Sequence, residues 1–220
     1  MKRYVGGVID GKQLDFSEYH EDYAVRIRAA GGCGLKLERQ QHFIEPKDPS
    51  WRALFEDGNW EKSLELFAAM TADMRAEQNQ LSGRGGEFRR VRVVELPLIP
   101  YLHWELYGLL RRTECGEQIV AVTPEQVAQY EQKAVLPEIV VIGKVVYQVL
   151  YGDDGAAVGA VVSTDPAEVR RWTTVLDTLF RAGEPLAPFF AREVSELPPP
   201  SVSFDVDGRP RITSTAGCRP

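Results

Sequence analysis

A predicted strand that contains three arginines directly precedes a predicted helix that is apolar on almost every side. Residues 88–94 have the sequence FRRVRVV, and their β-branched side chains are typical of a strand. Residues 97–112 are apolar around most of the helical circumference, which predicts a helix buried in the core. We expect its two prolines in the first turn and its paired arginines at the C-terminal end, where cations suit the helix dipole.

Strand and helix patterns are mixed along the rest of the chain. Strands are expected over residues 4–14, 35–39, 118–122, 138–142, 144–151 and 158–162, the last two as a β-hairpin. Helices are expected to end near residue 31, to begin at residues 48, 123 and 165, and to span 60–81. This mixture predicts an α+β (mixed α/β) fold: a single domain with a central mixed sheet flanked by helices.

The domain boundaries follow from the same patterns. We expect an N-terminal extension over residues 1–31, the α+β domain over residues 32–193, and a proline-led tail over residues 194–220 that is disordered.

Composition excludes several classes of protein. The chain has 220 residues, is 44% hydrophobic and carries a net charge of −6, which does not suit a disordered protein. No apolar stretch is long enough to span a bilayer or to act as a secretory signal, so we expect a cytoplasmic protein without a membrane association. Three widely spaced cysteines do not form a disulfide framework. An acidic chain has no overall attraction for nucleic acid, and direct nucleic-acid binding is not expected.

No familiar catalytic pattern is present in the sequence. The three histidines, His20, His42 and His103, are far apart and lack the spacing of metal ligands. No Ser or Cys lies in a recognisable nucleophile motif, and the Gly-rich segment 83–86 lacks the residues of a phosphate-binding loop. We therefore expect no catalytic residue, no metal site and no cofactor, and treat an enzymatic activity as the less favoured alternative.

The arginine-rich strand is the one place where charge and burial meet. Arg90 and Arg92 share one face of this strand, so a covered sheet would bury Arg92 and require an anionic partner. The following helix offers Glu105, the only acid among its apolar residues, with Tyr101 one turn earlier on the same face.

Three interpretations of this cluster stay open. The default is a structural ion pair that joins the helix to the strand. The functional alternative makes Arg90, Arg92, Tyr101 and Glu105 the polar floor of a ligand-binding pocket. Nucleic-acid binding is disfavoured because two glutamates bracket the arginines.

The sequence resembles an uncharacterised actinobacterial domain family. The resemblance covers roughly residues 32–190, and the run 88–94 followed by Pro97, Leu98, Tyr101, Leu102, Glu105 and Leu106 carries it most clearly. Further matching segments are Leu35-Lys36-Leu37-Glu38 with Phe43, Gly116-Glu117-x-Ile119, Tyr151-Gly152-Asp153-Asp154-Gly155 and Asp165-Pro166-Ala167. Members of this family are commonly encoded beside helix-turn-helix regulators, so the resemblance implies a regulatory or signalling context and transfers no catalytic residue.

Two function classes follow. The first is a non-enzymatic regulatory or signalling module that acts by protein–protein interaction, with a DNA-binding helix-turn-helix regulator as the candidate partner. The second is a small-molecule sensor or an unrecognised enzyme that uses the Arg/Tyr/Glu cluster as its pocket.

Overall fold

The structure, a computed structural model, describes residues 9–31, 33–204 and 210–211. Its strands are β1 (Lys12–Asp15), β2 (Gly34–Glu38), β3 (Phe88–Val93), β4 (Gln118–Val122), β5 (Ile139–Ile142), β6 (Val145–Tyr151), β7 (Ala157–Ser163), β8 (Glu184–Pro185), β9 (Ser203–Phe204) and β10 (Pro210–Arg211). Its helices are α1 (Phe16–Ala29), α2 (Pro49–Phe55), α3 (Trp60–Ser82), α4 (Pro100–Glu114), α5 (Pro124–Val127), α6 (Pro166–Ala182) and α7 (Leu186–Glu193), with a 3₁₀ turn over Ala128–Tyr130.

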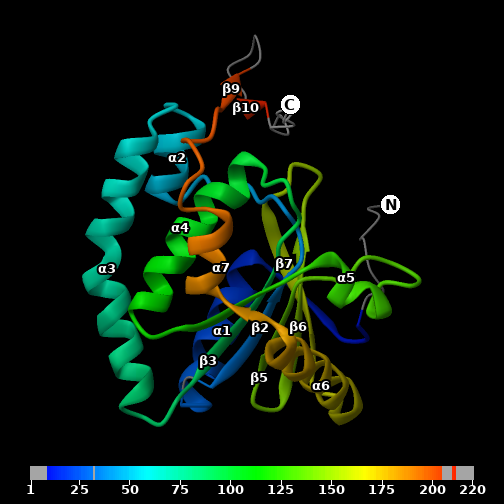
Figure 1. The fold of residues 1–220 in the computed structure, drawn as a ribbon. Helices are drawn as coiled ribbons and strands as arrows, with labels where there is room; N and C mark the ends of the chain where they lie inside the picture. Colours follow the sequence, from blue (N-terminus) through cyan, green and yellow to red (C-terminus); the bar gives the residue numbers. More distant parts are fainter. Residues whose placement is uncertain (1–8, 32, 205–209, 212–220) are drawn as a thin grey trace.

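A mixed sheet of eight strands forms the centre, in the order β1-β7-β6-β5-β2-β3-β4-β8, with helices on its faces (Figure 1). Strands β2, β3 and β4 run parallel, and the other neighbouring pairs are antiparallel. Both parallel connections are helical crossovers, through α2 and α3 and then through α4, because parallel neighbours need a long return connection. The predicted fold class, a central mixed sheet flanked by helices, is therefore confirmed.

The two faces of the sheet bury different side chains, because residues alternate along each strand. One face packs against α6, whose Trp172 and Leu176 lie in one apolar cluster with Val91 and Val93 of β3. On the other face, α1 packs against β5, β6 and β7, while α4 and α7 pack against β4. Strands β2 and β3 lie between these two helical groups.

Helix α4 is buried, as the sequence predicts, and most of its residues from Pro100 to Leu109 lie in the interior. Gly108 allows α3 to approach closely, since a Cβ at this position would come 2.8 Å from the Phe67 ring. The expectation that both prolines lie in the first turn is wrong for Pro97. A residue that precedes proline is driven to an extended conformation, and Ile99 (φ −81°, ψ 159°) therefore caps the helix at Pro100.

The segment that we assigned to an N-terminal extension contains β1 and α1. Strand β1 pairs antiparallel with β7 at the edge of the sheet. A capping box starts α1: the Asp15 side chain accepts from the Glu18 amide at 2.9 Å, and the Glu18 carboxylate accepts from the Asp15 amide at 3.0 Å. The strand expected over residues 4–14 falls partly outside the described residues, and the domain boundary at residue 32 stays a prediction.

The predicted disordered tail over residues 194–220 lies in large part outside the described residues. The described part continues from α7 to the short pair β9 and β10. Among the helices that the structure describes, none combines the length and apolarity needed to cross a membrane.

Candidate functional site

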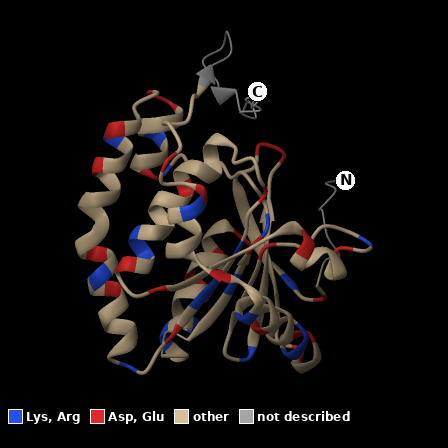
Figure 2. Cartoon of the chain, in the orientation of Figure 1, with Lys and Arg blue, Asp and Glu red and all other residues tan. Residues whose placement is uncertain are grey.

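Charged residues lie on the central strands of the sheet (Figure 2), and their side chains project from the face that carries α1 and α4. The parallel register sets Lys36 of β2 opposite Arg90 of β3, and Glu38 opposite Arg92. Because directly opposite residues share a face, all four side chains lie in the gap between the two helical groups.

Arg90 is held by two carboxylates. Its Nη1 donates to both carboxylate oxygens of Glu38 at 2.9 Å, and its Nε donates to Oε1 of Glu117 at 2.8 Å. The Arg90 side chain is only 12% exposed, so these charges interact with little screening by water. Burial opposes the charge on Arg90, yet Glu117 and Glu38 raise its pKa well above the usual value.

Glu38 is the shared anion of this group. Lys36 Nζ approaches Oε1 of Glu38 at 2.6 Å, in addition to the contacts from Arg90. Burial alone would raise the pKa of Glu38, but Arg90 and Lys36 hold that pKa far below its usual range. Glu38 therefore stays ionised at neutral pH.

Arg92 lies deeper than Arg90 and has no exposed side-chain surface. Its Nε donates to Oε2 of Glu105 at 2.7 Å, and its Nη1 donates to the Gln40 carbonyl at 2.6 Å. The Tyr101 hydroxyl completes the group with a 3.4 Å contact to Oε1 of Glu105. Within the described residues, Nη2 of Arg92 has no partner.

The four predicted site residues therefore divide into two sets. Arg92, Tyr101 and Glu105 are buried and joined to one another, in the arrangement expected of a structural ion pair. Arg90 instead lines an open cavity. A ligand-binding role for these four residues stays a prediction.

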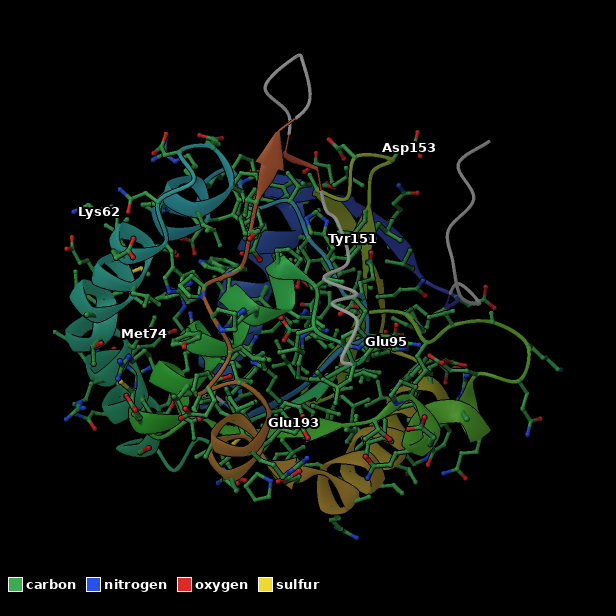
Figure 3. The ribbon with its side chains drawn as sticks, turned by 45° about the horizontal axis from the view of Figure 1, so that its top comes forward. Lys62, Met74, Glu95, Tyr151, Asp153 and Glu193 are labelled. Carbon is green, nitrogen blue, oxygen red and sulfur yellow. The ribbon has the colours of Figure 1, made fainter. Side chains whose placement is uncertain are left out.

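The cavity has a volume of about 350 Å³, at the lower end of the range for small-molecule sites. Its floor is formed by β2 and β3, and its walls by α1, the C-terminal half of α3, and the end of α4 with the segment that follows it. Apolar side chains of the lining include Met74, which Figure 3 labels on α3, Ile27 of α1 and Phe88 of β3. Cys115 also lines the cavity and is 8% exposed.

Cations outnumber carboxylates in this lining. The five cationic residues are Arg28, Lys36, Arg84, Arg90 and Arg112, and the two carboxylates are Glu77 and Glu117. Three of the cations, Lys36, Arg90 and Arg112, already pair with Glu38 or Glu117. Arg28 and Arg84 are exposed and form no ion pair within the described residues. The cavity is thus suited to a small anion.

Sequence reasoning missed most of the residues that surround Arg90. The alternation of Leu35, Lys36, Leu37 and Glu38 placed Lys36 and Glu38 on one face, so a signal existed. What could not be seen was the sheet order, because the β2–β3 and β3–β4 pairings join segments that are distant in the sequence.

The fold and the charged gap define a mixed α/β domain with an ion-paired sheet centre and an adjoining cation-rich cavity. The chain belongs to the family described as a domain of unknown function (DUF6879), whose model matches residues 21–191. Comparison with curated proteins and with solved structures gives no match.

Proposed function

We propose that this protein is a non-enzymatic regulatory module that binds a small anionic ligand in the cavity over β2 and β3. The observation that carries the proposal is that a cavity of about 350 Å³ is lined by five cationic residues and only two carboxylates. Clefts lined by one sign of charge concentrate ligands of the opposite sign. We favour this sensor class over the protein-interaction class because the cavity supplies a definite place for a ligand.

Arg28 and Arg84 are the residues that we assign to ligand contact. They come from different elements, α1 and the segment after α3, and both are exposed at the cavity. A guanidinium presents a planar fork of donors that matches carboxylate and phosphate oxygens. Lys36 and Arg90 lie on the floor, where their ion pairs with Glu38 hold them in place before a ligand arrives.

Binding is favoured over catalysis by the state of the carboxylates. Glu38 is ionised and held by two cations, and its lowered pKa makes it a weak proton acceptor at neutral pH. A ligand that adds negative charge here instead competes with Glu38 and Glu117 for Arg90. Such competition gives the module two charge arrangements that a partner can distinguish.

The test is ligand-induced stabilisation of the full chain. Inorganic phosphate and citrate are titrated while the melting temperature is followed, since a ligand that binds only the folded state raises it. We expect a saturable rise for at least one anion, lost in the Arg28→Ala, Arg84→Ala double variant. Arg111→Ala is the matched control, because Arg111 pairs with Glu114 on the same protein and does not line the cavity.

A second measurement locates the ligand. Cys115 lines the cavity, so a bound anion should slow its alkylation, which mass spectrometry of the Cys115 peptide can follow. A melting temperature that does not respond to any anion in a broad metabolite panel would rule out the sensor proposal. Stabilisation without protection of Cys115 would place the ligand elsewhere.

A protein partner is the second candidate function. The lining of the cavity carries a charge of +3 from five cations and two carboxylates, so the rest of this −6 chain carries −9. An acidic chain suits a basic partner, and charge complementarity speeds association with it. We retain the expectation of an actinobacterial, cytoplasmic protein whose partner is a helix-turn-helix regulator encoded nearby, and direct nucleic-acid binding stays the disfavoured alternative.

Affinity capture with the full chain as bait tests the partner proposal in the native host. The expected result is recovery of a DNA-binding regulator at low salt and its loss at high salt. Repeated captures that yield no regulator would count against this function and leave the anion proposal in place.

A further inference from the structure

A second cavity, of about 310 Å³, lies where β2 ends and β5 begins. Gln40, which follows β2, lines one side, and residues 135–138 and 148–153 line the rest. Figure 3 labels two of these residues, Tyr151 at the end of β6 and Asp153 in the turn that follows. Strand β2 has a parallel neighbour, β3, on one side and an antiparallel neighbour, β5, on the other.

Glu138 is the feature of this cavity that requires an explanation. It is 2% exposed. Its Oε1 accepts hydrogen bonds from the Arg39 amide at 2.7 Å and the Gln40 amide at 2.6 Å. Its Oε2 is buried and has no partner within the described residues. A buried carboxylate oxygen without a donor is costly and uncommon, so a donor from outside the chain is the natural complement.

The charge of the cavity indicates what kind of donor fits. Glu138 and Asp153 are the two acidic residues of its lining, and the lining includes no Lys or Arg. Apolar and aromatic side chains also contribute to the lining, with Leu136, Val149 and Tyr151 among them. An aromatic face attracts cations in addition to offering apolar contact. The lining of this cavity is therefore opposite in charge to that of the cation-rich cavity, and the two cavities share no residue.

We propose that this second cavity binds a small organic amine, whose ammonium group donates to Oε2 of Glu138 while its short apolar chain lies against Leu136 and Val149. The two amides that donate to Oε1 fix the position of the carboxylate before the ligand enters. Asp153, which is exposed, adds attraction at the opening.

The protonation of Glu138 is consistent with this role. Burial raises its pKa to about 7, against the lowering effects of Arg92 and the Arg39 and Gln40 amides, while Glu38 adds to the rise. Without a ligand the carboxyl group is thus partly protonated at neutral pH. A bound ammonium ion favours the ionised form.

The experiment uses the full chain, labelled with ¹⁵N, and n-butylamine as the probe. The amides of Arg39 and Gln40 donate to Glu138 and therefore report directly on its carboxylate. We expect saturable chemical-shift changes at these two amides with butylamine, and much weaker binding of 1-butanol and butyrate at matched ionic strength. Glu138→Gln should weaken butylamine binding by at least about tenfold, since it removes a charge-assisted hydrogen bond.

Asp154→Asn is the matched control. It removes one negative charge from the same turn as Asp153, yet Asp154 does not line the cavity. The affinity of the Asp154→Asn variant for butylamine should stay close to that of the unchanged chain. If Glu138→Gln does not fold, the comparison of the three probes on the unchanged chain decides.

Three outcomes would overturn the proposal. They are no saturable shift at the two amides, equal binding of butylamine and 1-butanol, and unchanged affinity in a folded Glu138→Gln variant. Each of them leaves the anion proposal intact, because that proposal rests on different residues and a different probe.

Discussion

Arg92 of β3 and Glu105 of α4 form an ion pair in the interior, with Nε of Arg92 2.7 Å from Oε2 of Glu105 and no exposed surface on the Arg92 side chain. Burying two charges is costly, and their mutual attraction offsets that cost only when both are present. This pair therefore joins α4 to the sheet at a fixed register, and removing one partner is far more disruptive than removing both.

Arg92→Met should lower the free energy of unfolding by about 3–5 kcal/mol, because it leaves Glu105 buried without its cation. The double variant Arg92→Met, Glu105→Leu should recover part of this loss, although the Gln40 carbonyl loses its donor in both. Urea denaturation measures both values. Arg111→Met, which breaks the exposed pair with Glu114, should cost less than about 1 kcal/mol. An Arg92→Met variant as stable as the unchanged chain would contradict this account.

Ser63→Ala should destabilise the protein by about 1–3 kcal/mol, because Ser63 connects three helices through one hydroxyl. Trp104 Nε1 of α4 donates to Ser63 Oγ at 2.9 Å, and Ser63 Oγ donates to the Ser50 carbonyl of α2 at 2.8 Å. Chemical denaturation followed by tryptophan fluorescence gives the measurement. Ser82→Ala, at the exposed end of α3, is the control and should change stability by less than about 0.5 kcal/mol.

His103→Gln should change how stability responds to acid. Burial lowers the pKa of His103 from 6.5 to about 4, so the folded chain keeps this ring neutral. Between those pH values the unfolded chain binds a proton that the folded chain does not, and stability falls as pH decreases from 6.5 to 4. The His103→Gln variant has no such titrating group. As the pH decreases, the free energy of unfolding of the unchanged chain should therefore fall relative to that of the variant, by up to about 1.4 kcal/mol per pH unit. Denaturation curves at pH 4.5, 5.5 and 7 measure the difference, and a constant difference would contradict it.

Glu138→Gln should show a pH dependence of the opposite sign. Burial raises the pKa of Glu138 from 4.5 to about 7, so between these values the folded chain holds a proton that the unfolded chain has released. Stability due to this group is therefore lost as pH rises from 4.5 to 7. The glutamine variant should gain on the order of 2–3 kcal/mol relative to the unchanged chain over that range. The same denaturation series, extended to pH 8, provides the test. A variant that becomes more stable relative to the unchanged chain as the pH decreases would contradict the prediction.

Local patterns in the sequence were sufficient to predict most of the fold. The β-branched residues of 88–94 predict β3, the apolar circumference of 97–112 predicts the buried α4, and the helix starts expected at residues 123 and 165 match α5 and α6. Such signals depend on neighbours within a turn or two, which is why they are visible without tertiary information. The start of α4 was misplaced, because the effect of Pro100 on Ile99 outweighed the helical pattern before it.

Only part of the candidate site could be predicted from the sequence. That Arg92 would need Glu105 followed from strand parity and from the single acid in an apolar helix, because burial leaves a charged group few acceptable partners. The partners of Arg90 did not follow in this way. Glu38 and Glu117 reach it from β2 and from the segment that precedes β4.

Local sequence patterns thus indicate most of the strands and helices, which of their faces are apolar, and that a buried arginine needs an acid. The tertiary structure decided the order of the sheet, and with it that Arg90 faces a cation-rich cavity while Arg92 is closed off beneath α4. The physical reason is the range of the interactions. Secondary structure is set by neighbours along the chain, whereas the environment of a charge is set by whichever strands pair across the sheet.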